Sequence, residues 1–438
     1  MNHHNDCNLL QPYFRAFNDL FTPELLHQAL DFSHLKFRDR VLPASAVLLV
    51  CIAAFLRGKV GLPLVLQWLG FGSSAANISD QALYQAHDRI GWRPIWWLRR
   101  HVLTWLSDPT RDPTAFYNGL RLIAMDGTTF TVADTPDNER TFGKSKNQYK
   151  KSGFPLMRML ALCELGTRAL VDWIARSYRV SEQALSLRLA RSVPAGSLLL
   201  ADRNFHSGKL WEIAKNSGFF MLLRVQRGPK FPVNEYLPDG SYLSKVRLPC
   251  RKNQKAEWMT VRVIECLLTI GTRVSTYRFV TNLLDPVASP ARELVQLYQK
   301  RWEIESAFAE FKDQLKGRNT VLRSYHPQGV MAELDALMIG YFAARRLALQ
   351  AARRAKIDPL RISFRQMVEV LMLYVQRPKM SRDRLYRAAA KKQNKRRKRS
   401  YRRCKKVVRC AWPVKTAADG QILYNEVEID ILGEKSTP

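Results

Sequence analysis

Acidic residues are scarce in this chain of 438 residues, which has 38 Asp and Glu against 70 Lys and Arg. The formal net charge is therefore +32, and the isoelectric point lies near pH 10.2. An excess of this size attracts polyanions over long distances. It predicts a nucleic acid as the first candidate partner and an anionic membrane surface as the second.

Paired metal-binding cysteines are also missing. The seven cysteines include no CxxC pair and the eight histidines are scattered, so the sequence spells out no zinc site. An odd number of cysteines without a regular framework is typical of proteins in a reducing compartment. These observations favour the cytoplasm and exclude a disulfide scaffold.

Long hydrophobic runs are absent as well. The most apolar stretch, residues 46–56, has eleven residues. It is too short to cross a bilayer and predicts a buried helix instead. The first ten residues are polar and do not resemble a signal peptide. We therefore expect a cytoplasmic protein with no membrane partner, which leaves nucleic acid as the favoured polyanion.

The residues that are present divide the chain into five parts. Residues 1–115 repeat apolar residues at helical spacing and predict a helical domain, for which DNA binding and simple packing or dimerisation are about equally open. The other parts are an α/β core begun by residues 116–228, a β-rich insertion at 229–287, the rest of the core with a long helix and further helices at 288–377, and a basic C-terminal tail at 378–438.

The core is predicted to be a mixed-sheet α/β fold, because strand patterns come first and then alternate with helices. An apolar strand at 120–127 is followed by a separate alternating strand at 128–134, and residues 155–178 read as a hairpin that turns at Gly166 and Thr167. The expected elements that follow are helix 180–193, strand 196–205, helix 206–218 and strand 219–226.

Two aspartates stand at the predicted ends of apolar strands. Asp126 follows the run LIAM and Asp202 follows the run LLLA. Rigid strands can hold two carboxylates near one point, where their oxygens are ligands that suit Mg²⁺. An aspartate at one strand end more often caps a turn. The two together make a metal site the better hypothesis.

A third carboxylate comes from the predicted helix at residues 298–312. At 100° per residue, Tyr298, Arg301, Glu305 and Lys312 share an arc of roughly 60°. Beside this arc runs an apolar stripe of Ile304, Phe308 and Phe311, which would pack on the sheet. Glu303 and Glu310 fall on the far side and are expected to be solvated.

The arc has two interpretations. An ion pair between Arg301 and Glu305, four residues apart, would occur on any exposed helix. Alternatively, Glu305 completes a set of three carboxylates with Asp126 and Asp202, and such a set can hold two metal ions for phosphodiester chemistry. Arg301 and Lys312 would then bind phosphates beside the metals. The second interpretation alone explains why Tyr298 and Lys312 lie on the same arc.

At these residues the chain resembles the insertion-sequence-four family of bacterial DDE transposases. The catalytic helix of that family carries Y-(2)-R-(3)-E-(6)-K, which Tyr298, Arg301, Glu305 and Lys312 match without a gap. The motifs MDGTTF and ADRNF resemble the family's first and second acidic motifs. The long separation of the second and third acids accommodates the family's β-strand insertion. The resemblance covers about residues 45–370 and leaves the basic tail outside.

The resemblance implies a ribonuclease-H-like core and catalytic, metal-binding roles for Asp126, Asp202 and Glu305. Two Mg²⁺ ions, or Mn²⁺ in their place, are the implied cofactors. The residues implied to contact transposon-end DNA are Tyr298, Arg301 and Lys312, with Arg203 and Arg224 as weaker candidates. Family members that cut through a DNA hairpin hold a flipped base on an aromatic ring. Tyr277 in the insertion is the first candidate for that ring, and Trp258 is the alternative.

The function predicted in this way is that of a DNA transposase. The resemblance implies a bacterial, nucleoid-associated cytoplasmic enzyme that cuts double-stranded DNA at its own element's ends and joins them to target DNA as a homodimer. Two alternatives remain open: a catalytically silent or domesticated DNA-binding derivative, and a nuclease of the same fold. Residues 391–409, with 12 Lys and Arg and no acid, are expected to add salt-sensitive, sequence-independent affinity for DNA.

Overall fold

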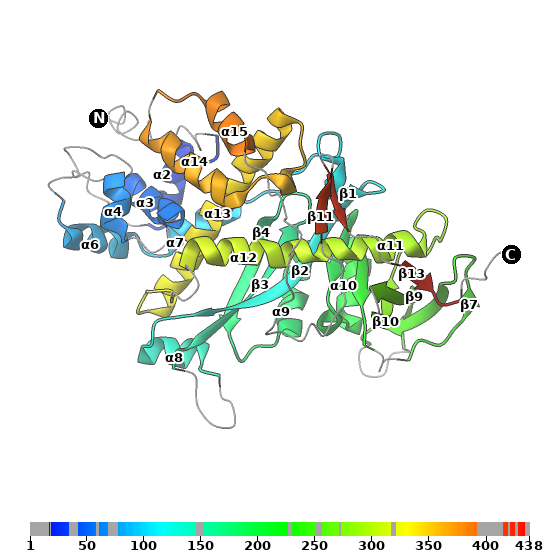
Figure 1. The fold of residues 1–438 in the computed structure, drawn as a ribbon. Helices are drawn as coiled ribbons and strands as arrows, with labels where there is room; N and C mark the ends of the chain where they lie inside the picture. The colour runs from blue at the N-terminus through cyan, green and yellow to red at the C-terminus, as the bar shows by residue number, and fades with distance from the viewer. Residues whose placement is uncertain are drawn as a thin grey trace.

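The computed structural model describes residues 17, 19–34, 43–57, 61–68, 78–145, 153–226, 230–250, 256–270, 273–316, 321–377, 379–391, 415–418, 421–424 and 428–433. Figure 1 shows a helical region at one end of the molecule and a β-rich region at the other. A long helical segment, α11 (Ala291–Tyr298) and α12 (Trp302–Lys316), runs between them across the central strands. No helix in the described ranges is long and apolar enough to span a membrane.

Eleven strands of the described chain form a single sheet, in which nine follow the order β4-β3-β2-β5-β6-β10-β9-β8-β7. In its core half, β2 (Leu120–Thr131), β3 (Leu156–Glu164) and β4 (Ala169–Ser177) are antiparallel. On the other side of β2, β5 (Ser197–Ala201) and β6 (Phe220–Arg224) run parallel to it. This order of three antiparallel strands flanked by two parallel ones is ribonuclease-H-like, so the predicted fold class is confirmed.

The first strand of the core is longer than predicted. The sequence suggested a strand end after Asp126, whereas β2 continues without interruption to Thr131, so that prediction is wrong. The reason lies in its neighbours: β3 pairs with β2 along Asp126 and Gly127, but the pairing with β5 stops at Met125 opposite Ala201. Asp126 therefore lies where the neighbouring strand ends, and the β5 side of β2 is open at that point.

The predicted hairpin and core helices are confirmed. β3 and β4 form the hairpin, and Gly166 in its turn is needed for space, since a β-carbon there would lie 2.2 Å from the β-carbon of Ala115. Helix α9 (Glu182–Leu189) starts at Ser181, whose side chain accepts a hydrogen bond from the backbone N–H of Ala184. Helix α10 (Gly208–Ser217) stops at Gly218, which has a left-handed backbone.

The β-rich insertion contains β7 (Glu235–Tyr236), β8 (Tyr242–Arg247), β9 (Trp258–Ile270) and β10 (Arg273–Thr281). It is continuous with the core, because β10 pairs with β6 through Phe279 opposite Arg224. One sheet therefore extends from the core into the insertion, which is fixed beside β6.

The N-terminal helical region is present as predicted. Its described helices are α2 (Pro23–Asp31), α3 (Ala44–Arg57), α4 (Leu62–Trp68), α6 (Asp80–Ile90) and α7 (Arg93–Val102). The apolar run predicted to be a buried helix lies in α3, where Ala46–Ile52 are buried. Helix α13 (Pro327–Ala355) contacts α3, α7 and β4 and so joins these helices to the core.

The C-terminal part contains more structure than the predicted tail. Helix α14 (Phe364–Gln376) ends just before residue 378, where the tail was predicted to begin. Helix α15 (Arg382–Lys391) lies inside the predicted tail, yet it packs against α13. Strands β11 (Lys415–Ala418) and β12 (Gln421–Tyr424) pair with each other, and β13 (Glu428–Ile431) pairs with β9 of the insertion. Apart from Lys391, the basic segment lies outside the described residues.

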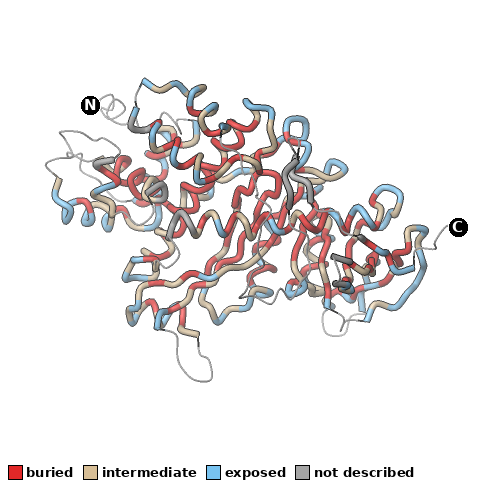
Figure 2. Tube along the Cα trace, in the orientation of Figure 1, coloured by how far each residue is buried: buried red, intermediate tan, exposed pale blue. Residues whose placement is uncertain are grey.

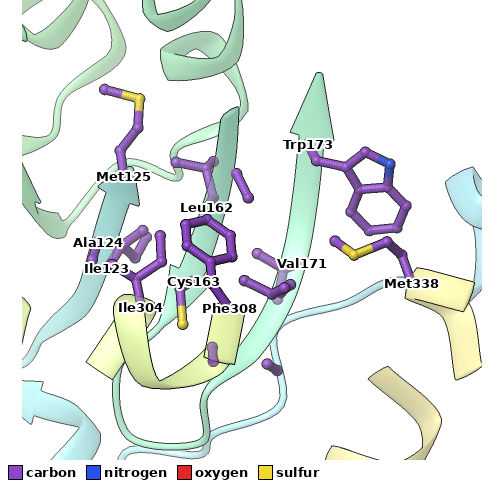
Figure 3. Close-up of a cluster of buried hydrophobic side chains, with 14 of the residues drawn as sticks. Ile123, Ala124, Met125, Leu162, Cys163, Val171, Trp173, Ile304, Phe308 and Met338 are labelled. Atoms are coloured by element: carbon purple, nitrogen blue, oxygen red, sulfur yellow. The ribbon is translucent and has the colours of Figure 1, made fainter. Parts of the chain in front are cut away.

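The hydrophobic core fixes the long helical segment against the sheet. Figure 2 shows that the central strands are largely buried, and β2 becomes partly exposed from Asp126 to Thr129. Ile304 and Phe308 of α12 are buried, and Figure 3 shows them beside Ile123, Ala124 and Leu162 of the sheet. Phe311 is buried too, so the predicted apolar stripe is confirmed. One detail differs, because residues Gln299–Arg301 form a tighter 3-10 turn between α11 and α12.

Candidate active site

Two of the predicted acids are brought together by the register of neighbouring strands. Met125 of β2 pairs with Ala201 of β5, so Asp126 and Asp202 are the next residues on two adjacent parallel strands. The Asp126 Oδ1 atom accepts a hydrogen bond from the Gly127 N–H at 2.8 Å, and the Asp202 Oδ1 atom accepts one from the Arg203 N–H at 2.6 Å. Each carboxylate is held by the backbone that follows it.

The third acid, Glu305, reaches the same place from α12. Its side chain keeps 40% of its surface exposed, above the buried residues Ile304 and Phe308. Arg301 links it to the sheet: its Nη1 atom lies 3.0 Å from Asp126 Oδ2, and its Nη2 atom lies 2.9 Å from Glu305 Oε1. The helical arc predicted from the sequence therefore faces Asp126.

The three carboxylates also share one electrostatic environment. Burial raises the pKa of Asp126, Arg301 and the Gly127 N–H oppose this rise, and the Asp202 charge adds to it. Burial likewise raises the pKa of Glu305, Arg301 lowers it, and the charges of Asp126 and Asp202 raise it again. A cation among these groups relieves both the desolvation and the mutual repulsion of the acids.

The donor set suits a divalent metal, although in the described part of the chain no three acidic, histidine or cysteine side chains form a ready-made metal cluster. The guanidinium of Arg301 lies between Asp126 and Glu305 and already acts as the cation there. Three carboxylates supply the hard oxygen ligands that Mg²⁺ and Mn²⁺ prefer. The residues therefore fit divalent ions once Arg301 turns away.

Two other members of the arc are less exposed than a DNA contact would suggest. Tyr298 is 3% exposed, and its hydroxyl donates to the Ala201 carbonyl at 3.1 Å. It therefore pins the helical segment to the end of β5 and offers no open surface in this conformation. Lys312 is partly buried, and its ammonium group donates to the Thr128 hydroxyl on β2.

The weaker candidates lie after β5 and around the end of β6. Arg203 is exposed directly after Asp202. Arg224, at the end of β6, lies over the ring of Tyr277 at 4.4 Å from the ring centroid. Tyr277 is only 3% exposed and stacks on Phe279, so it presents no open ring face to a flipped base. Trp258, the alternative, is 54% exposed, but it lies at the start of β9, six residues before Ile264, whose partner Phe279 pairs with Arg224. It is therefore at the end of the insertion that points away from Asp202.

Glu303 and Glu310 are not the solvated charges that the sequence suggested. Glu303 is fully buried and accepts a hydrogen bond from Arg168 Nε at 2.6 Å, and Glu310 accepts one from Arg168 Nη1 at 2.8 Å. Glu310 also pairs with the buried Arg345 of α13. The prediction failed because both arginines are distant in the sequence. This network holds α12 against the β3–β4 turn.

A further acid near the site was missed. Glu182, in the first turn of α9, lies so close to β2 that a β-carbon on Gly127 would be 2.7 Å from its Oε1 atom. The sequence carried two weak signals, a glycine directly after Asp126 and a glutamate in the first turn of a helix. Neither indicates proximity without the sheet register.

Comparison with known proteins identifies the family. A family model described as "Transposase DDE domain" matches residues 117–341, which make up just over half of the chain and include all three acids. The chain belongs to this family of DDE transposases. The resemblance to the insertion-sequence-four family is confirmed by its relatives, and the protein is a DNA transposase.

Two transposases and one solved structure illustrate the similarity. The transposase is 24% identical over 366 residues to "Transposase InsG for insertion sequence element IS4" of Escherichia coli, covering 82% of each chain. It is 30% identical over 147 residues to "Putative transposase InsZ" of Escherichia coli, covering 32% of this chain and 47% of the relative. A solved piggyBac transposase synaptic complex with hairpin DNA shares 11% identity at a TM-score of 0.42, covering 86% and 84% of the two chains.

Proposed function

We propose that Asp126, Asp202 and Glu305 are the catalytic acids of this transposase and that they bind two Mg²⁺ ions, for which Mn²⁺ can substitute. The observation that carries the proposal is the double ion pair of Arg301, which joins Asp126 of the sheet to Glu305 of α12. Asp202 lies on the adjacent strand, and its charge raises the pKa values of both other acids. These are three oxygen donors around one cation position.

Bound at these acids, divalent ions would activate an oxygen nucleophile and stabilise the leaving oxygen of a phosphodiester. The chain's own residues supply the rest. Arg301 leaves the acids and binds a phosphate of the DNA end, for which its planar fork is suited. Lys312, with Arg203 and Arg224, adds positive charge along the DNA strand. Tyr298 keeps the helical segment in register with β5 through its bond to Ala201.

The overall reaction we propose is cutting at the ends of the transposase's own element, release through a hairpin, and joining of the ends to target DNA. The two ends must be held together, so we propose a homodimer on DNA in the bacterial cytoplasm. The N-terminal helices and the insertion would read the end sequence.

The alternatives have less support. A silent derivative would be expected to have lost an acid, yet all three are present and share one environment. A nuclease of the same fold would have no need of a strand-transfer step. No feature of the described residues favours either one.

The test is a set of charge-removing variants. Asp126→Asn, Asp202→Asn and Glu305→Gln should each reduce nicking of end DNA with Mg²⁺ by at least about 1,000-fold, because each removes a ligand of the reacting centre. Binding to the uncut end, measured by gel shift, should persist. Glu212→Gln on α10 serves as the control. Nicking that survives in any one of the three would exclude that residue from the catalytic set.

A further inference from the structure

Glu182 lies against β2 directly beside the proposed catalytic acids. It occupies the first turn of α9, and its carboxylate fills the space where a side chain at position 127 would be. Successive side chains of a strand point to opposite faces. Asp126 faces Arg301 and α12, so Gly127 faces the other side, where Glu182 approaches from α9. The strand thus has a glutamate on each of its two faces at this point, Glu305 and Glu182.

The charge of Glu182 is coupled to the other acids. Burial raises the pKa of Glu182, Arg158 lowers it, and the charges of Asp126 and Asp202 raise it again. Its side chain is 31% exposed, so it is neither a buried structural group nor a free surface charge. The charges of Asp126 and Asp202 therefore raise the pKa of Glu182 as they raise the pKa of Glu305.

An ordinary structural role does not account for this position. An acid in the first turn stabilises a helix, but that effect does not require contact with a strand. Arg158 forms an ion pair with Glu182, but a long one, with 3.9 Å between its Nε atom and Glu182 Oε1. Arg158 is also engaged elsewhere, because its Nη1 atom donates to the Val180 carbonyl at 2.6 Å and its guanidinium lies over the Tyr178 ring. The carboxylate therefore lies against Gly127, the residue directly after Asp126, with only a long ion pair to Arg158.

We propose that Glu182 is a fourth acidic residue of the catalytic centre, which strengthens the binding of divalent ions there from the α9 face. Gly127 leaves the space through which its carboxylate reaches the site. This inference rests on the proposed function of Asp126, Asp202 and Glu305. It does not depend on which DNA the transposase recognises.

The first experiment measures ion binding without DNA or turnover. Mn²⁺ is titrated into the full-length transposase and followed by calorimetry or by the loss of the free-ion electron paramagnetic resonance signal. Glu182→Gln should weaken Mn²⁺ binding about 10-fold, the usual scale for an outer group of a metal site. Glu212→Gln, a glutamate of α10, should leave it unchanged. Thermal unfolding of both variants checks that the fold is retained.

A second variant tests the same contact without touching the glutamate. Gly127→Ala places a methyl group against Glu182 Oε1, and the flexible end of the glutamate must move to make room. The variant keeps the N–H that holds Asp126. It should weaken Mn²⁺ binding as Glu182→Gln does, and the double variant should be no weaker than either single one. Losses that add up fully would show that the two residues act separately and would overturn the inference.

A third variant separates this inference from the proposed function. Asp126→Asn should abolish the Mn²⁺ binding and the nicking. If it does so while Glu182→Gln binds Mn²⁺ like the unaltered protein, the inference about Glu182 is wrong and the three-acid site stands. If Asp126→Asn still nicks DNA and binds Mn²⁺ normally, the proposed function itself fails.

Discussion

Arg301 is the residue on which the arrangement of the site depends most directly. It is 7% exposed and holds Asp126 and Glu305 with separate nitrogen atoms of one guanidinium. A planar group with two donors can join two carboxylates in fixed directions, whereas an ammonium is a single point charge. Arg301 therefore sets the distance between sheet and helix before any DNA or metal arrives.

This geometry predicts that even a conservative change is harmful. Arg301→Lys keeps the charge but loses the second donor, so it should weaken the complex with cleaved end DNA and lower strand transfer about 10-fold or more. Initial binding to uncut DNA should change little. The measurement is a strand-transfer assay with precut ends, with Arg365→Lys on the exposed face of α14 as the matched control.

Equal strand-transfer rates in these two lysine variants would contradict a special role for Arg301. The effect would then be that of an exposed helical ion pair, which contributes at most about 1 kcal/mol. The pairing of Arg365 with Glu369, at 2.9 Å and also four residues apart, is such a pair. The comparison thus separates a site residue from an ordinary surface contact.

Helical periodicity predicted which residues of α12 face Asp126 better than it predicted their surroundings. The 100° spacing correctly separated Glu305, which faces Asp126, from Glu303, which faces away. It could not show that Glu303 is buried, because the partner, Arg168, comes from a turn more than 130 residues earlier in the chain. Spacing reports direction around one helix, and burial depends on what the fold brings against it.

At the scale of whole elements, α12 is held by a buried ionic network as well as by its apolar stripe. Arg168 joins Glu303 and Glu310, and Arg345 of α13 contacts Glu310 from the other side. Removing one partner of a buried pair leaves an uncompensated charge, which is far more costly than losing a surface pair. The network thus ties the stability of the core to the placement of Glu305.

Glu303→Ala should therefore lower the free energy of unfolding by about 3–5 kcal/mol. The control, Glu369→Ala, breaks an exposed pair on α14 and should cost less than about 1 kcal/mol. Urea unfolding followed by circular dichroism measures both. If Glu303→Ala lowered the free energy of unfolding as little as Glu369→Ala does, the buried charge of Arg168 would not need Glu303 as its partner.

Sequence patterns identified the core strands but misplaced the end of one of them. The apolar run before Asp126 and the run before Asp202 correctly indicated two neighbouring core strands. The end of β2 was placed too early because Gly127 resembles a turn residue, whereas the structure uses it to admit Glu182. Strand pairing decides such a case, since β3 continues beside β2 after β5 has ended.

At the scale of the whole molecule, the excess of basic residues is the dominant property. Residues 391–409 contribute 12 of the 70 Lys and Arg, but removing them would still leave the chain strongly basic. Elements on both sides of this segment belong to the fold, because α15 packs on α13 and β13 pairs with β9. A test of the segment must therefore keep the chain after it.

Replacing the eleven Lys and Arg of residues 392–409 with Gln preserves chain length and the β13 pairing. The affinity for random duplex DNA should then fall less steeply with salt, because fewer phosphates are neutralised on binding. Fluorescence anisotropy across a salt series gives the slope for both proteins. An unchanged slope would show that the segment takes no part in DNA binding.

The three-acid centre itself is tested most directly by locating its metal ions. The measurement is anomalous diffraction at the manganese edge, on crystals of the transposase grown with cleaved end DNA and Mn²⁺. We predict two peaks about 3.5–4 Å apart, bound by Asp126, Asp202 and Glu305, with Arg301 turned onto a DNA phosphate. Manganese bound elsewhere, with Arg301 still bridging Asp126 and Glu305 in the presence of cut DNA, would contradict the account.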